Sequence, residues 1–229
     1  MQMRPPKPLR GECLWGRQDA VNAQAELDRS LTLLQTDHFD LYQLHAMSSQ
    51  EDYDTVMAPG GAMEVLRKAK AAGIVKNIGF SAHNEDVACQ LIATGEFDSI
   101  LTAFNYMSWT VGGFGQRMMA AAQDQGNAPP PLWLREVALK HEAHTHIADP
   151  AGMAILGIKS LARCQYQEGE DKKYSSCWYA PEEDAAFQER LYKFSLGVGV
   201  SVCVSPGTLH HLCVHVQQLS ATTCQHVVV

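Results

Sequence analysis

The chain has 229 residues, of which 46% are hydrophobic and 19% charged, and its formal net charge is −7 at pH 7. These values are typical of a globular domain large enough for a substantial core. The negative charge argues against binding nucleic acid through bulk electrostatics. No stretch approaches the roughly 20 apolar residues that a membrane-spanning helix requires, so we expect no membrane partner.

The first predicted helix begins at Ala20. Its apolar residues recur four, four and three positions apart, a spacing that places them on one helix face. They are Ala23, Leu27, Leu31 and Leu34. Thr36 and Asp37 then interrupt the pattern, and the segment after them is typical of a strand.

Strands and helices alternate along the rest of the chain. The predicted strands are Phe39–His45, Val75–Ser81, Ile100–Phe104, Met153–Lys159 and Val198–Ser205. Further helices are predicted after Gly61, after the capping residue Asn84, over Arg117–Gln125 and from Pro181, a residue favoured at the first helical position. Strict alternation with short connections predicts a parallel sheet covered by helices.

Two α/β architectures fit this order, a doubly wound open sheet and a (β/α)8 TIM-type barrel. A doubly wound nucleotide-binding sheet usually carries G-x-G-x-x-G after its first strand, and the absence of that motif favours the barrel. About five of the eight βα units are predicted, so we expect an incomplete barrel over residues 20–207. Residues 127–152 are too long for an ordinary loop and are expected to be a foreign insertion, and residues 208–229 an atypical tail.

The cysteines and the N-terminal segment predict where the protein resides. The seven cysteines contain no C-x-x-C pair, and an odd number of scattered cysteines predicts reduced thiols in an intracellular, cytoplasmic protein. The basic segment MQMRPPKPLRGE is not followed by an apolar run and is therefore no secretory signal, although an organellar location stays open. Residues 1–19 are proline-rich and are expected to be a disordered lead-in.

Polar residues stand at the ends of four predicted strands. They are His45, Ser81, Asn105 and Lys159. Both candidate architectures place functional sites at the carboxyl ends of their strands, so these residues are candidates for the site.

Alternation along the first strand indicates where His45 points. Leu41, Gln43 and His45 fall on one side of the strand, and Tyr42 and Leu44 on the other. If the first set faces the barrel axis, His45 emerges at the mouth of the barrel. The alternative is a structural histidine bonded to a backbone carbonyl.

Three ordered segments resemble the aldo-keto reductase family, in particular its bacterial-type branch with a GFSAH strand end. They are LDRSLTLLQTDHFDLYQLH, GGAMEVLRKAKAAGIVKNIGFSAH and MAILGIKSLAR. The resemblance covers residues 20–119 and 153–163 and weakens over 181–207. It implies a (β/α)8 barrel that reduces carbonyl compounds with NADPH, through a catalytic Asp, Tyr, Lys and His. In that set the Tyr is the general acid and the His orients the carbonyl.

The resemblance also implies roles for individual residues. His45 matches the catalytic histidine, and Ser81 matches the serine that bonds the nicotinamide carboxamide. Asn105 is expected to be a further carboxamide contact. The residues that follow the strand where the family holds the cofactor pyrophosphate are Lys159, Ser160 and Arg163. Exposed surface charge is the alternative for Arg163, and the resemblance implies no definite role for His83.

The catalytic Asp, Tyr and Lys have no match in the sequence. In the family they come from strands upstream of the helix at 20–34, whereas only nineteen residues precede that helix here. The chain therefore resembles a family member lacking its N-terminal strands, with His45 as the single catalytic residue. The expected function is NADPH-dependent reduction of a small carbonyl compound to an alcohol, impaired in this chain. The alternative is a non-catalytic, truncated relative that acts as a binding or assembly module, with self-association through open sheet edges.

Two groups of histidines and cysteines have spacings compatible with zinc. The first is His141, His144 and His146, and the second is Cys213, His215, Cys224 and His226. Because both groups fall in segments that do not follow the barrel pattern, we expect no metal.

Overall fold

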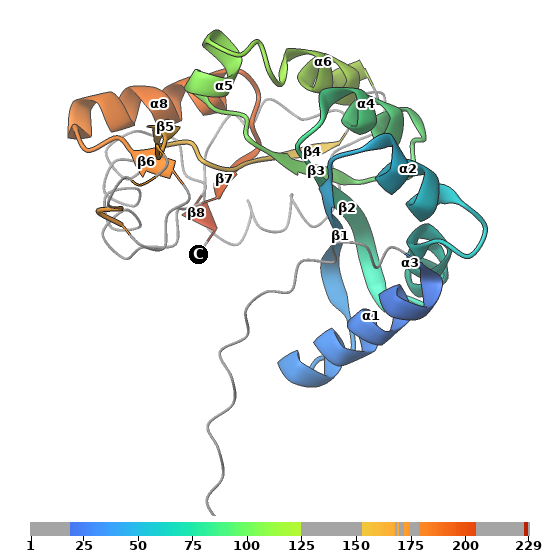
Figure 1. Cartoon of the computed structure of the whole chain (residues 1–229). Helices are drawn as coiled ribbons and strands as arrows, with labels where there is room; N and C mark the ends of the chain where they lie inside the picture. Colours follow the sequence, from blue (N-terminus) through green and yellow to red (C-terminus); the bar gives the residue numbers. More distant parts are fainter. Residues whose placement is uncertain are drawn as a thin grey trace, which may run out of the picture.

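The computed structural model describes residues 19–124, 153–167, 169, 172–174, 179–204 and 227–228 (Figure 1). Its helices are α1 (Ala20–Leu34), α2 (Gln50–Met57), α3 (Ala62–Ala71), α4 (Glu85–Ala93), α5 (Tyr106–Thr110), α6 (Gln116–Asp124) and α8 (Ala185–Gly197). The strands of the main sheet are β1 (Phe39–Met47), β2 (Val75–Ala82), β3 (Ser99–Thr102), β4 (Ala154–Gly157), β7 (Val202–Val204) and β8 (Val227–Val228). A separate antiparallel pair consists of β5 (Ala162–Gln165) and β6 (Tyr179–Pro181).

The main sheet has the order β1-β2-β3-β4-β7-β8, and every neighbouring pair is parallel. The helices lie along the outer side of the curved sheet (Figure 1). The predicted parallel α/β alternation is therefore confirmed. Within the described residues β1 and β8 each pair on one side only, so the sheet is open and the barrel type is incomplete, as expected.

The larger part of the core lies between the sheet and the outer helices. Its fully buried members from the strands include Ile78, Phe80 and Ile100, and Leu44 of β1 packs in the same cluster. The opposite, inner face carries a smaller apolar cluster of Ala154, Leu156 and Val202, with Leu41 and Leu101 packed against it. Leu41 and Leu44 thus face opposite sides of the sheet, which confirms the alternation predicted for β1 and places His45 on the inner face.

Local capping explains why the helices begin where they do. The Asp19 carboxylate accepts a hydrogen bond from the Asn22 backbone N–H at 3.0 Å and begins α1. Ser49 and Asp52 form a reciprocal capping box at α2. That box precedes a mostly polar helix, which has too few apolar residues for periodicity to predict it.

Asn84 begins α4, directly after the site-bearing end of β2. Its side-chain oxygen accepts from the Asp86 N–H at 2.9 Å and from the Val87 N–H at 3.2 Å. Replacing Asn84 with alanine is expected to lower the free energy of unfolding by about 1 kcal/mol, because two helix N–H groups lose their acceptor. Urea titration measures this, and Asn84→Ser should recover most of the loss. Equal losses for both variants would contradict a capping role.

The segment around Pro181 differs from the prediction. Pro181 does not open a helix, because it ends β6 in the antiparallel pair with β5. The helix begins four residues later, where the Asp184 carboxylate accepts from the Phe187 N–H at 2.8 Å. The preference of proline for the first helical position was therefore outweighed by strand pairing and a better cap.

The last predicted strand begins later than expected. Val198 caps the C-terminal end of α8, and Val200 donates its N–H to the Ser195 carbonyl at 3.2 Å. The strand itself covers Val202–Val204. The apolar run continues from the end of α8 into the strand, and hydrophobicity alone does not show where one element ends and the next begins.

Several predictions fall on residues that the structure does not describe. They are the lead-in up to residue 18, the insertion at 127–152, most of the tail at 208–229, and both possible zinc-binding groups. Among the described helices, none is both long and apolar enough to cross a membrane.

Candidate functional site

The parallel strands bring several of the predicted residues to one edge of the sheet. Ser81, Leu101 and Leu156 pair side by side across β2, β3 and β4. Gln43 of β1 pairs with Gly79 of β2. His45 lies two residues beyond Gln43, and Ser81 lies two residues beyond Gly79, so His45 and Ser81 lie at the same level of the sheet. Carboxyl ends of parallel strands therefore meet here, as expected for the site of such a fold.

A bulge in β1 fixes the backbone next to His45. The pairing with β2 shifts between Leu44 and Met47, so β1 has one extra residue there. Ala46, inside the bulge, has a φ of 55°, a left-handed conformation that is unusual for a residue with a side chain. Its N–H donates to the Ser81 hydroxyl oxygen at 2.7 Å. Bulges re-aim side chains at the rims of barrels, and this one holds exposed His45 at the end of the sheet.

Ser81 is buried and keeps one hydrogen-bonding function for a ligand. Only 6% of the residue is exposed, and its oxygen accepts from Ala46. A hydroxyl has one donor hydrogen beside its acceptor lone pairs. No acceptor for that hydrogen occurs among the described residues. The hydrogen is therefore available to a carbonyl oxygen at this edge.

Asn105 is buried at the end of β3, where it caps α5. It is 2% exposed, and its side-chain oxygen accepts from the Ser108 N–H at 2.9 Å. The oxygen is thus occupied by the fold. The NH2 group is the part of this side chain that could serve a ligand.

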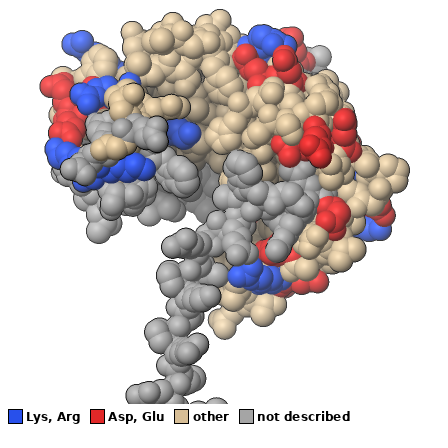
Figure 2. All heavy atoms as spheres, viewed as in Figure 1, with Lys and Arg blue, Asp and Glu red and all other residues tan. Residues whose placement is uncertain are grey.

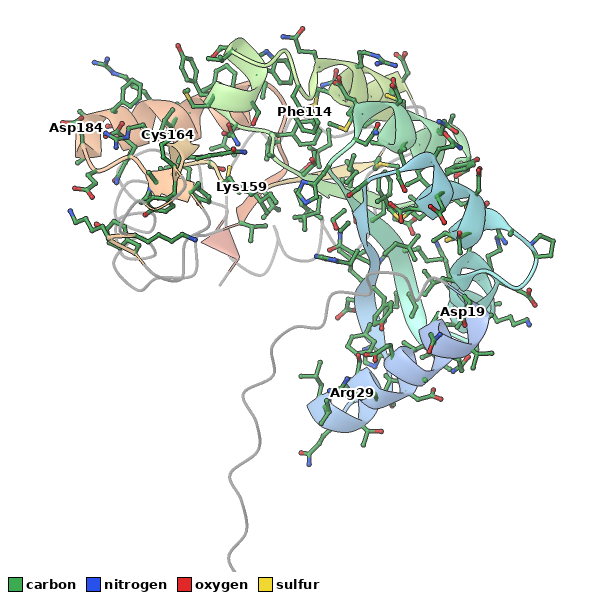
Figure 3. The ribbon with its side chains drawn as sticks, in the orientation of Figure 1. Asp19, Arg29, Phe114, Lys159, Cys164 and Asp184 are labelled. Carbon is green, nitrogen blue, oxygen red and sulfur yellow. The ribbon has the colours of Figure 1, made fainter. Side chains whose placement is uncertain are left out.

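Lys159 follows β4 and has an unusual backbone. Its φ of 60° is left-handed, and its carbonyl accepts from the Ala162 N–H at 2.9 Å. Two of the three described non-glycine residues with positive φ, Ala46 and Lys159, therefore lie at strand ends of this edge, and the third ends α1. Unusual backbone conformations concentrate at functional sites. Figure 3 shows Lys159 beyond the end of β4.

His83 is a residue to which the sequence pattern assigns no definite role. It follows Ser81 by two positions, and its N–H donates to the Met47 carbonyl at 3.2 Å, which ties it to the end of β1. Partial burial lowers the pKa of His83, and the charges of Lys159 and His45 lower that pKa further. Its position directly after β2, two residues beyond Ser81, is the signal in the sequence that could have identified His83.

Ser160 and Arg163 have contrasting surroundings. Ser160 is 2% exposed, and its hydroxyl has no well-oriented hydrogen-bond partner among the described residues. It lies near the thiol of Cys203, whose pKa burial raises to about 11 and the Ser160 hydroxyl lowers to a smaller extent. Arg163 is exposed on β5, and its charge acts on the Glu183 carboxylate, which is bonded to Lys173. The structure therefore gathers His45, Ser81 and Lys159 with His83, and it places Arg163 on the surface beside an acid.

Comparison with known proteins identifies the fold. Residues 17–124 match the model of the aldo/keto reductase family. This segment belongs to the aldo/keto reductase family. The match covers α1 to α6 and three strands of the sheet, and it includes His45, Ser81 and Asn105.

Solved aldo-keto reductase structures extend the likeness beyond that segment. A Pseudomonas aeruginosa protein described as an aldo-keto reductase is 16% identical, with a TM-score of 0.55 over 90% of this chain and 61% of its own. The holo form of an aldo-keto reductase from Bacillus halodurans is 18% identical, with a TM-score of 0.51 over 89% of this chain and 61% of its own. The chain thus has the aldo-keto reductase fold and spans about three fifths of the length of these structures. A search of curated proteins finds no significant match.

The edge formed by the carboxyl ends of the parallel strands has hydrogen-bond donors suited to a dinucleotide cofactor. Ser81 offers a hydroxyl hydrogen, Ser160 is a buried hydroxyl beside the Cys203 thiol, and Lys159 has no carboxylate partner among the described residues. A carboxamide oxygen and phosphate oxygens are acceptors that such a donor set fits. Among the described residues no group of three or more histidines, cysteines or acids could hold a metal ion.

Proposed function

We propose that this chain binds NADPH and a small carbonyl compound at the carboxyl ends of β1, β2, β3 and β4, as an aldo-keto reductase-type oxidoreductase with impaired turnover. The observation that carries the proposal is the convergence of His45, Ser81 and Lys159 at one edge of a sheet that has the family fold. The described donors fit the groups that such a cofactor presents.

His45 is proposed to orient the carbonyl. NADPH supplies a hydride to a carbonyl carbon, which leaves negative charge on the carbonyl oxygen. A neutral imidazole N–H can hydrogen-bond that oxygen as the charge develops. His45 is exposed at the edge, and its backbone is held by the adjoining bulge, so its ring has access to a bound carbonyl.

Five residues are proposed to hold the cofactor. The Ser81 hydroxyl and the Asn105 NH2 group suit the carboxamide, and the Lys159 ammonium and Ser160 hydroxyl suit phosphate oxygens. Arg163 would have to exchange its interaction with the Glu183 carboxylate for a phosphate. We expect Arg163 to contribute least of the five.

Turnover is expected to be low because the family's catalytic Asp, Tyr and Lys have no counterpart that the sequence pattern identifies. General acid catalysis by a positioned side chain contributes about 10²–10⁴-fold to a rate. A site with the orienting histidine and no tyrosine acid would bind its ligands and turn over slowly.

Titration of the full chain with NADPH tests the proposal. We expect quenching of tryptophan fluorescence, since Trp109 lies four residues after Asn105 at this edge, and little oxidation of NADPH when aldehydes or ketones are added. Lys159→Met should weaken NADPH binding about tenfold, the effect of losing one charge-assisted hydrogen bond. Lys193→Met is the matched control, because Lys193 pairs with Glu189 on α8. Absence of NADPH binding would refute the proposal, and rapid turnover would refute the impairment.

The alternative function is assembly through the open edge of β1. Within the described residues β1 has nine residues and pairs with β2 alone. A long unpaired edge is a template for another strand. Size-exclusion chromatography with light scattering separates the two functions, since a concentration-dependent dimer without NADPH binding would favour assembly.

A further inference from the structure

His83 is an imidazole at the site edge that the proposed function does not use. It lies two residues beyond Ser81, and its N–H is bonded to the carbonyl of Met47 at the end of β1. His83 therefore cannot move away from the end of β1 without breaking that bond. His83 lies one residue beyond the end of β2, and its side chain is exposed.

Lys159 lies beyond the end of β4, two strands away from β2 and His83. The strands β2, β3 and β4 are consecutive neighbours, so the backbones of β2 and β4 lie about 10 Å apart. Leu101 pairs with both Ser81 and Leu156, which puts His83 and Lys159 at similar heights beyond the sheet. Long side chains span such a distance, and the charge of Lys159 acts on His83.

The acids nearest to His83 in the sequence are engaged elsewhere. Glu85 accepts from the Gly115 N–H at 2.9 Å and from the Arg117 N–H at 3.2 Å, at the start of α6. Asp86 pairs with the Arg117 guanidinium at 2.7 Å. Acidic side chains that are visible in Figure 2 lie over the outer helices. Lys159 has no carboxylate partner among the described residues, so no described acid neutralises its positive charge at the site edge.

We infer that His83, Lys159 and His45 form an oxyanion subsite at this edge, suited either to a substrate carboxylate next to the reacting carbonyl or to a phosphate of the cofactor. An ammonium and two imidazole N–H groups supply donors and positive charge, and no described acid competes with the ligand. The inference rests on the proposed function for the identity of the ligand, since a carboxylate next to the carbonyl defines an oxo acid as the substrate class.

The subsite links anion binding to proton binding. The pKa of His83 lies below the ordinary value of about 6.5, so the ring is neutral at pH 7. An oxyanion favours the charged ring and raises that pKa, and by linkage the anion binds more tightly as the pH falls through the pKa that the ring has in the complex. At higher pH the neutral rings still offer N–H donors and Lys159 supplies the charge.

Histidine ring signals in NMR spectra of the full chain test the subsite with two probes. Oxamate is a carboxylate that NADPH cannot readily reduce, and inorganic pyrophosphate represents the cofactor phosphates. We expect at least one probe to shift the His83 signals and to raise its pKa, with about tenfold weaker binding in His83→Gln and in Lys159→Met. His38→Gln is the control, because His38 pairs with Asp37 on the exposed surface.

The arms of this experiment separate the ligand sources and the two proposals. Oxamate that binds together with saturating NADPH identifies a substrate carboxylate, and pyrophosphate that competes with NADPH identifies a cofactor phosphate. If neither probe shifts His83, or if His83→Gln and His83→Asn both fold and bind the probes as well as the unmodified chain does, the subsite is refuted. Refutation of the subsite does not affect NADPH binding in the fluorescence titration. Conversely, oxamate binding at His83 without NADPH binding refutes the proposed function and not the subsite.

Discussion

Replacing Phe80 with alanine is expected to lower the free energy of unfolding by about 3–5 kcal/mol, the range for removing a fully buried aromatic ring. Phe80 is 0% exposed on the helix side of β2, and its ring meets that of Phe97 edge-to-face at a centroid distance of 4.9 Å. Since domains are stable by only about 5–15 kcal/mol, the loss would unfold a large share of the chain under mild denaturant.

Phe187→Ala is the matched control for this prediction. Phe187 carries the same ring, is 38% exposed, and meets Tyr106 at a centroid distance of 6.5 Å. Urea titration followed by circular dichroism should give a midpoint near that of the unmodified chain for Phe187→Ala and a much lower one for Phe80→Ala. Similar midpoints for the two variants would contradict the burial of the Phe80 ring in the core.

The sequence predicted the strands best where one face of the sheet is apolar. Phe39–His45 and Val75–Ser81 were each placed within two residues of the observed ends, because buried residues alternate or run continuously there. Elements that depend on distant partners were not predicted. The pair β5–β6 is held by pairing across intervening residues, and α5 has five residues with none buried, so neither gives a periodic signal.

For the candidate site, the sequence predicted which residues lie at one edge of the sheet but not how they interact. Polar residues after parallel strands indicated His45, Ser81 and Lys159 without knowledge of the register. The bond from Ala46 to Ser81 depends on a bulge 35 residues away in sequence, and no local pattern predicts it. The effect of Lys159 on His83 likewise requires two intervening strands to be in place. Sequence reasoning therefore identified which residues could act and not how the fold prepares them.

Replacing Ser81 with alanine is expected to have the largest effect on the site itself. The variant removes the acceptor of the Ala46 N–H, and leaving a partly buried N–H without its bond costs about 1–3 kcal/mol. It also releases a left-handed residue, a conformation that costs roughly 1–2 kcal/mol for a residue with a side chain. Ala46 can then relax toward an extended conformation, which changes the direction of the adjoining His45.

We therefore expect Ser81→Ala to disturb both the orientation of His45 and the binding of the cofactor. Ser81→Ala should lower the free energy of unfolding, shift the His45 ring signals in NMR spectra, and weaken NADPH binding about tenfold by removing a carboxamide contact. Ser201→Ala is the matched control, because Ser201 Oγ accepts from the Ile155 N–H at 3.1 Å, a bond of the same kind at the amino end of β4. It should cost similar stability and leave His45 and NADPH binding unchanged. If both variants affect NADPH binding equally, the effect reflects stability alone, and Ser81 neither positions His45 nor contacts the cofactor.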